Sequence, residues 1–95
     1  MEIVRKQHAS NKLIAAICAA PTVLHDAGAL KDKRYTAHYA VADELPEILS
    51  QEKVVLDGNI LTSRGAGTAL DFGLAMVYQL MGPGKAAEVK ASICV

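Results

Sequence analysis

The chain has 95 residues, of which 52% are hydrophobic and 21% charged, so it predicts one globular domain at most and excludes a disordered tail. Its ten basic and ten acidic residues balance to zero, so neither a nucleic acid nor a membrane surface is an expected partner. No apolar run approaches the roughly 18 residues that span a bilayer, and the first ten residues lack a signal-peptide core, so we expect a cytoplasmic protein.

The first predicted elements are a polar helix, a buried strand and a short second helix. Residues 2–12 form a weak helix pattern, which Ser10 and Asn11 interrupt. Residues 13–17 are apolar without alternation, which is typical of a strand buried on both faces of a parallel sheet. Pro21 suits the first turn of a helix, and Gly28 suits the left-handed residue that follows its end.

The middle of the chain predicts a second strand, a brief helix and a hairpin. Residues 34–41 are rich in β-branched and aromatic residues and favour a strand. Asp43 then suits the cap of a short helix that includes Pro46 and Ile48. Residues 53–63 contain two β-prone runs on either side of Asp57-Gly58, the strongest hairpin signal in the sequence.

The longest predicted helix follows the hairpin. Gly65 and Gly67 bracket a tight turn, and Thr68 with Asp71 has the spacing of a capping box at the helix start. Gly73, inside the helix, indicates close packing against a neighbouring element. The residues expected to face the core recur at helical spacing: Leu70, Leu74, Val77 and Met81.

The last segment predicts a stop, a short helix and an end in a strand or tail. Residues 82–84 read Gly-Pro-Gly and end the long helix, residues 85–89 form a further helix, and residues 91–95 follow it. The alternation of strands and helices predicts an α/β fold, but the strands are too few for a closed parallel sheet. We therefore expect exposed strand edges that pair with another chain.

Cys18 is the main candidate for chemistry, because it stands where the first strand passes into the helix opened by Pro21. Unpaired amides and the positive end of a helix dipole favour a thiolate there, and the same amides suit a developing oxyanion. This is the arrangement of a nucleophile elbow. A free cysteine is equally often a small buried apolar residue, and the pattern leaves both interpretations open. Cys18 and Cys94 form no CxxC pair, so neither a disulfide framework nor a zinc ribbon is expected.

Other candidates have strong alternative interpretations. His38, at the end of a predicted strand, is more commonly a hydrogen-bonded structural residue than a catalytic one. Arg64 can hold an anion or pair with a carboxylate. The glycine-rich residues 65–68 lack a complete phosphate-binding motif, which favours a packing turn. His25 and Asp26 are expected on a solvated helix face.

Two segments, "AAICAAPTVL" and "VVLDGNILTSRGAGTALDFGLAMV", resemble the DJ-1/PfpI superfamily, and within it the DJ-1/YajL branch. The resemblance covers almost the whole chain. It implies a flavodoxin-like three-layer α/β sandwich with a mainly parallel sheet, normally dimeric. Residues 1–95 would supply the C-terminal part of a single such domain.

The resemblance also implies roles for single residues. Cys18 matches the reactive cysteine, Ala19 would supply an oxyanion amide, and His38 matches a pocket histidine. Ser63, Arg64 and Gly65 match a turn beside the pocket and the dimer interface. No metal or organic cofactor is implied.

Two departures from the family are evident. The residue after the pocket histidine is Tyr39 here and proline in the family. The family's N-terminal half, with the glutamate that hydrogen-bonds the cysteine, has no counterpart in the sequence. We therefore expect a separate chain that carries this half; a domain-swapped homodimer is the less favoured alternative.

The implied function is cysteine-dependent chemistry on small reactive dicarbonyls, of the glyoxalase III or protein deglycase type. The alternative is a non-enzymatic sensor of oxidative stress or a redox-regulated chaperone, in which Cys18 is oxidised to a sulfinate. A peptidase of the PfpI type would need His38 as a base beside Cys18, and Tyr39 makes it the least favoured of the three.

Overall fold

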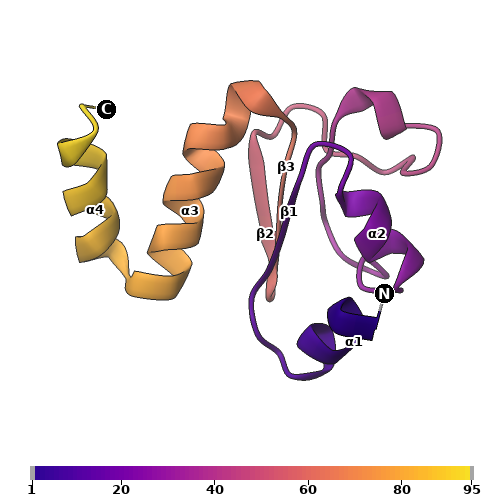
Figure 1. The fold of residues 1–95 in the computed structure, drawn as a ribbon. Coiled ribbons are helices and arrows are strands. Elements are labelled where there is room, and N and C mark those ends of the chain that lie inside the picture. The colour runs from indigo at the N-terminus through magenta and orange to yellow at the C-terminus, as the bar shows by residue number, and fades with distance from the viewer. Residues whose placement is uncertain (1, 95) are drawn as a thin grey trace.

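The computed structural model describes residues 2–94, with a three-stranded sheet at its centre (Figure 1). The strands are β1 (Ile14–Ile17), β2 (Val54–Asp57) and β3 (Ile60–Ser63), in the order β1-β3-β2. β1 is parallel to β3, and β2 is antiparallel to it. This places β3 in the middle and leaves β1 with a free edge.

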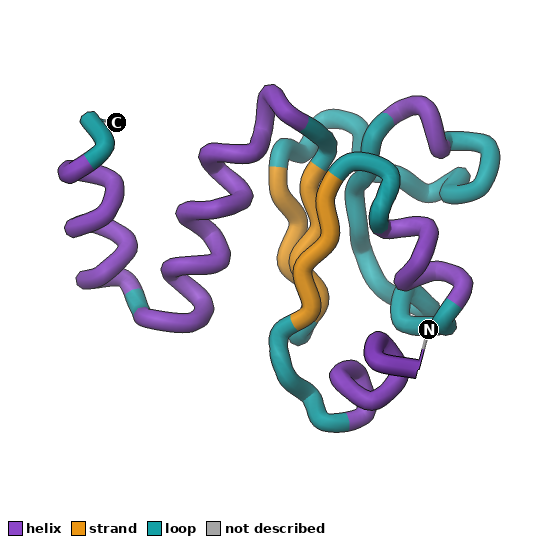
Figure 2. The backbone as a smooth tube through the Cα atoms, viewed as in Figure 1, coloured by secondary structure: helices purple, strands orange, loops and turns teal. Residues whose placement is uncertain are grey.

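Helices lie on both faces of the sheet (Figures 1 and 2). Helix α3 (Ala69–Met81) covers one face, and α2 (Pro21–Asp26) with the long segment after it covers the other. Helix α4 (Pro83–Ser92) packs outside α3, away from the sheet, and α1 (Glu2–Ala9) lies below β1. The molecule is thus the predicted α/β arrangement in layers. None of the helices within residues 2–94 has the length and apolar character to cross a membrane.

The main core lies on the α2 face of the sheet. Its buried members come from all the elements on that side: Ile14, Ala16, Leu24, Ala29, Leu30, Tyr35, Ala37, Leu45 and Ile60. β3 is buried along its whole length, as a central strand should be. β1 is buried only at alternate positions, since Ala15 is exposed. The expectation that β1 is buried on both faces is therefore wrong within residues 2–94, because Ala15 remains uncovered on the face opposite Ile14 and Ala16.

Several local predictions are confirmed. The hairpin turns through Gly58, whose φ of +62° is left-handed, and Asn59 then joins it to β1 by accepting a hydrogen bond from the amide of Ile14 at 2.8 Å. Gly28 (φ +79°) ends α2 as predicted: its amide donates to the carbonyl of His25 at 3.0 Å, and the next amide donates to that of Leu24 at 2.9 Å. This pair of bonds is the Schellman motif.

The predicted strand at 34–41 is wrong. Alternate amides of this segment donate to groups outside any backbone ladder: Arg34 to Asp57 Oδ2 at 2.8 Å and Thr36 to Thr62 Oγ1 at 2.9 Å. Side chains thus replace the strand partner, and a 3-10 turn, η1 (Tyr39–Val41), follows. The short helix predicted around 43–48 is also absent from the described residues, because Pro46 lacks an amide hydrogen and disfavours helical geometry at Leu45.

The predicted capping box of α3 does not form. The Thr68 hydroxyl oxygen instead accepts hydrogen bonds from the amides of Arg64 at 3.2 Å and Gly65 at 3.1 Å, and lies 2.7 Å from Ser63 Oγ. Asp71 pairs with Lys53, 3.9 Å away. Thr68 therefore fixes the turn that precedes α3, which includes the short 3-10 helix η2 (Ala66–Thr68).

The outward faces of the last two helices also differ from expectation. Phe72 is the buried residue of α3, whereas Leu70 and Met81 are exposed, and a Cβ built on Gly73 would meet nothing within 4 Å. The predicted stop after α3 is confirmed, but α4 extends to Ser92 instead of spanning 85–89. Residues 91–95 were predicted as a strand or tail, but the first two of them belong to α4. Residue 95 lies outside the described residues.

We predict that Thr68→Val lowers the free energy of unfolding by about 1–3 kcal/mol, because two backbone amides lose their acceptor while the side-chain volume is kept. The control is Thr68→Ser, which retains the hydroxyl and should remain closer to the parent. Urea denaturation measures both. Equal stability of the Val and Ser variants would contradict the role given to this hydroxyl.

Candidate active site

Cys18 occupies a sharp turn between β1 and α2. Its φ is +66°, a left-handed conformation that L-residues other than Asn and Asp rarely adopt, and its side chain is exposed. The turn is held on both sides: the Cys18 amide donates to the carbonyl of Ser63 at 3.2 Å, and the Ala20 amide donates to that of Ile17 at 3.1 Å. An exposed thiol in a left-handed turn between a strand and a helix has the geometry of a nucleophile elbow.

The amide of Ala19 has no acceptor within residues 2–94, unlike the amides on either side of it. The Ala19 carbonyl is fixed, because it accepts from the Thr22 amide at 3.1 Å and from the Thr22 hydroxyl at 2.8 Å. An oriented peptide with an uncommitted N–H next to a nucleophile is a suitable donor to an oxyanion.

The backbone of His38 is hydrogen-bonded to the Cys18 turn, and its ring is fixed by a further hydrogen bond. Its amide donates to the carbonyl of Cys18 at 2.7 Å, and its Nδ1 accepts from the amide of Ala40 at 3.0 Å. Because Nδ1 is the acceptor, the neutral imidazole carries its proton on Nε2. The ring also lies 4.3 Å from that of Tyr39, and a Cβ on Gly65 would be 3.4 Å from its Cδ2. His38 is thus a ring of fixed orientation whose second nitrogen, Nε2, has no hydrogen-bond partner among residues 2–94.

An open cavity of about 430 Å³ lies against His38. It brings together three of the residues predicted for the site, His38, Arg64 and Gly65, and it contains no carboxylate. Its full lining is His38, Tyr39, Arg64, Gly65, Ala66, Gly67 and Thr68. Cys18 and Ala19 do not line it; they adjoin it through the backbone bond to His38. Tyr39 and the 66–68 turn were not predicted as pocket residues, although an aromatic residue beside the histidine was a usable signal.

Ser63 and Arg64 hold neighbouring backbone segments in place around the site. Ser63 is fully buried, and its hydroxyl donates to the carbonyl of Lys53 at 2.6 Å, which makes it structural. The guanidinium of Arg64 donates to the carbonyl of Ser50 and has no carboxylate partner within residues 2–94. It therefore ties the 48–52 turn to the pocket.

The remaining polar candidates are dispersed. His25 and Asp26 are exposed on α2, as expected, and Cys94 is a free thiol beyond α4. Within the described part of the chain, no group of three or more His, Cys, Asp or Glu side chains is placed to hold a metal ion. The chemistry that these residues support by themselves is nucleophilic addition by the thiol, with backbone and imidazole donors beside it.

We predict that Cys18→Gly is more stable than Cys18→Ala by about 1 kcal/mol, because both variants lack the thiol and only glycine adopts a left-handed conformation without cost. Thermal or urea unfolding of the two variants measures the difference. An Ala variant as stable as the Gly variant would show that the elbow relaxes out of this conformation.

The chain is similar to known proteins over most of its length. Residues 1–79 match the model of the DJ-1/PfpI family. Protein DJ-1alpha of Drosophila melanogaster is 45% identical over 91 residues, which cover 93% of this chain and 42% of that protein. A protein of Caenorhabditis elegans named glutathione-independent glyoxalase DJR-1.2 is 38% identical over 97 residues, covering 99% of this chain and 52% of that protein.

Among solved structures, that of Drosophila melanogaster DJ-1beta superposes with a TM-score of 0.93 at 39% identity, covering 99% of this chain and 52% of that one. The chain thus spans about half the length of the relatives it matches, and its sheet and helices correspond to part of their fold. On its sequence and its structure, the chain belongs to the DJ-1/PfpI family.

Proposed function

We propose that this chain is the C-terminal part of a DJ-1-like domain in which Cys18 acts on small reactive dicarbonyls, as in glyoxalase III or protein deglycase chemistry. The observation that carries the proposal is the exposed thiol in a left-handed turn, next to the uncommitted amide of Ala19. The name of the nematode relative, a glutathione-independent glyoxalase, supports the same substrate class.

The first step uses residues of this chain. The thiolate of Cys18 attacks the aldehyde carbon of a 2-oxoaldehyde such as methylglyoxal; a C–S bond forms and the carbonyl electron pair moves to oxygen. The amide of Ala19 donates to this oxygen and stabilises the hemithioacetal. A base then moves the proton from the first carbon to the second, which gives a lactoyl thioester, and water releases lactate and the thiol. The whole conversion is redox-neutral.

His38 has the role of a donor in this scheme. Since the Ala40 amide fixes the acceptor on Nδ1, the neutral ring offers only an N–H, at Nε2, to a substrate. This suits the second carbonyl oxygen of a dicarbonyl. It does not suit the base of a peptidase, which must accept the proton of its nucleophile, so we favour the dicarbonyl function over PfpI-type proteolysis.

The base that moves the proton is a carboxylate from outside this chain. No Asp or Glu lines the cavity beside His38, and the free edge of β1 is open to further strands. We propose that a separate chain with the N-terminal half of the domain pairs with β1 and brings a glutamate to Cys18, and that the assembled protein is dimeric. Two unpaired thiols support a cytoplasmic, reducing compartment.

The second candidate function is a redox sensor or redox-regulated chaperone. An exposed thiol with an adjacent free amide also suits a cysteine that is oxidised by peroxide to the sulfinate, whose oxygens the amide then holds. The difference between the functions lies in turnover, since the sensor consumes no dicarbonyl.

We predict that Cys18→Ser abolishes methylglyoxal consumption by the chain assembled with an N-terminal half, whereas Cys94→Ser retains it. Serine keeps the size of the side chain but is a much poorer nucleophile. Turnover is measured as the amount of lactate formed. A separate measurement, mass spectrometry after mild peroxide treatment, reports the oxidation of Cys18. Equal turnover of the parent and Cys18→Ser would contradict the enzymatic function; selective oxidation of Cys18 without turnover would favour the sensor.

A second pair of variants separates the structural role of His38 from its donor role. In His38→Asn the amide oxygen can still cap η1 by accepting from Ala40, so stability should stay near that of the parent while turnover falls about 10²-fold. In His38→Ala the cap is lost as well, and stability should fall by about 1 kcal/mol. Full activity of the Asn variant would contradict the donor role of His38 and leave it only the role of capping η1.

A further inference from the structure

Tyr39 is an exposed aromatic residue whose backbone is held in place. It begins η1, and its carbonyl accepts a hydrogen bond from the amide of Ala42 at 3.1 Å. The preceding carbonyl, that of His38, accepts from the amide of Val41, also at 3.1 Å. Tyr39 is 73% exposed. Single exposed apolar residues are ordinary on protein surfaces, so the exposure of Tyr39 indicates a role only through its position.

That position is the wall of the cavity in the candidate active site. The ring centroid of Tyr39 lies 4.3 Å from that of His38, with the two planes tilted by 31°, and both residues line the cavity. Three other lining residues, Gly65, Ala66 and Gly67, carry no side chain larger than a methyl group. A Cβ built on Gly67 would meet nothing within 4 Å. The cavity thus combines an aromatic wall with open space.

The size of the cavity leaves room for a substrate larger than methylglyoxal. Its volume is about 430 Å³, which falls in the range of about 300–1,000 Å³ that is typical of pockets for drug-sized ligands. A three-carbon aldehyde fills only part of such a space. The remaining volume lies beside Tyr39 and the small residues of the 65–67 turn.

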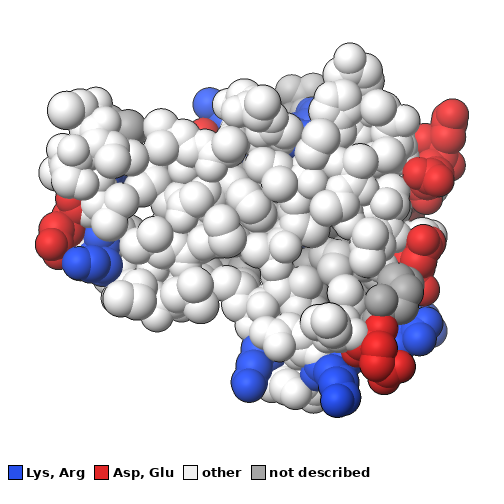
Figure 3. Space-filling model, in the orientation of Figure 1, with Lys and Arg blue, Asp and Glu red and all other residues white. Residues whose placement is uncertain are grey.

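The charges around the cavity favour an uncharged group in this space. Within residues 2–94 no Asp or Glu lines the cavity, and the guanidinium of Arg64 donates to the carbonyl of Ser50. Figure 3 likewise shows no acidic side chain on the surface between the start of α3 and η1. A cationic group would find no counter-charge there, whereas an uncharged flat group can stack on the ring of Tyr39.

The proposed chemistry directs one part of the substrate toward Tyr39. In a 2-oxoaldehyde, R-CO-CHO, Cys18 attacks the aldehyde carbon, and the Nε2–H of His38 suits the ketone oxygen. The group R is bonded to the same carbon as that oxygen, so it lies beside the ring of His38. The neighbouring ring in the cavity wall is that of Tyr39.

We propose that Tyr39 is a specificity-determining residue, which stacks on the group R and raises the specificity of this chain for aryl 2-oxoaldehydes such as phenylglyoxal. The inference rests on the function proposed above and names its substrate class. The chemical steps stay the same: a C–S bond forms at the aldehyde carbon, a proton moves from the first carbon to the second, and water releases the thiol. Phenylglyoxal and water thereby give mandelate, and no external oxidant is needed.

The test compares kcat/KM for phenylglyoxal and for methylglyoxal, measured as mandelate and lactate formed. The chain is assembled with the N-terminal half of Drosophila DJ-1beta. Tyr39→Leu should lower the phenylglyoxal-to-methylglyoxal ratio about fivefold, because leucine is apolar but cannot stack. Tyr39→Phe retains the ring and should keep the ratio. Both aldehydes use Cys18 and His38, so a displacement of His38 in a variant cancels in the ratio.

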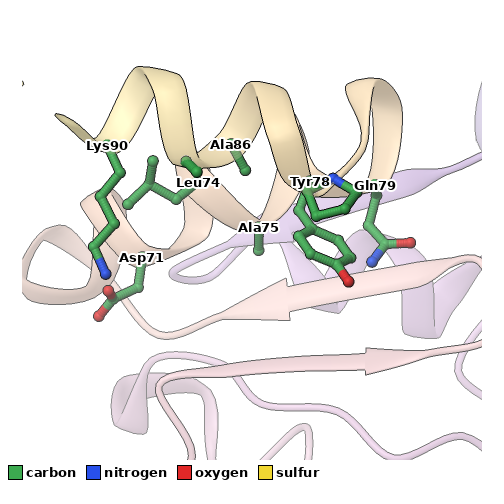
Figure 4. A pocket seen from close by; sticks show the side chains of 9 residues that line it. Asp71, Leu74, Ala75, Tyr78, Gln79, Ala86 and Lys90 are labelled. Atoms are coloured by element: carbon green, nitrogen blue, oxygen red, sulfur yellow. The ribbon is translucent and has the colours of Figure 1, made fainter. Parts of the chain in front are cut away.

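Tyr78 offers the matched control. It is 51% exposed and lines a different cavity, between α3 and α4, with Gln79 and Lys90 (Figure 4). Tyr78→Leu makes the same change of side chain outside the candidate active site, so the ratio should equal that of the parent.

Each outcome separates the inference from the function on which it rests. If methylglyoxal is converted but phenylglyoxal is not, or if Tyr39→Leu keeps the parental ratio, the inference is wrong and the proposed function stands. If Tyr39→Phe loses as much as Tyr39→Leu, the hydroxyl rather than the ring is responsible, which overturns the stacking role. If the parent converts neither aldehyde, the proposed function fails and the inference fails with it.

Discussion

The parallel pairing of β1 with β3 is the contact on which the site depends. Its register sets Ile17 opposite Ser63, and the next residue, Cys18, then donates its amide to the Ser63 carbonyl. The same register puts the elbow beside the 64–68 turn and the ring of His38. A shift by one residue would turn the side chains of β1 to the opposite face and separate the thiol from the pocket.

Polar side chains of β3 also position the loops that lie outside the sheet. The hydroxyl oxygen of Thr62 accepts a hydrogen bond from the amide of Thr36. This bond holds the segment that leads to His38 against the α2 face of the sheet. The Ser63 hydroxyl donates to the carbonyl of Lys53 and lies next to the Thr68 hydroxyl. The Thr68 oxygen accepts a hydrogen bond from the amide of Arg64. Both hydroxyl residues are fully buried. The carboxyl end of one central strand thus positions both loops that form the cavity, and buried hydroxyls do so only because each has a partner.

The sequence predicted those features that local rules determine. The apolar run before Cys18, the Asp57-Gly58 turn and the glycine after α2 each have a short-range cause, and all three are confirmed. The strand expected at 34–41 failed because its amides bond to side chains more than 20 residues away, which no local pattern contains. Of the residues that line the cavity, His38, Arg64 and Gly65 were among those predicted for the site. Thr68 was not, because its place in the cavity wall depends on a turn that the capping-box pattern does not describe.

Helix α3 shows a second kind of limit. Its pattern at residues 70, 74, 77 and 81 was interpreted as the core face, yet the chain buries Phe72 instead. The helix is apolar on more than one side, and within residues 2–94 Leu70 and Met81 stay exposed while Phe72 is buried. Periodicity identifies the apolar sides of a helix but not the elements that cover them, so it did not show that Phe72 is the residue that α3 buries.

The long separation between β1 and β3 has a consequence for synthesis. β2 and β3 are neighbours in sequence and can pair as soon as they are made, whereas β1 is made before β2 and must wait for β3. During that interval β1 lacks the strand that covers one of its edges. The strand that bears the elbow is therefore the segment most in need of a chaperone while the chain is growing.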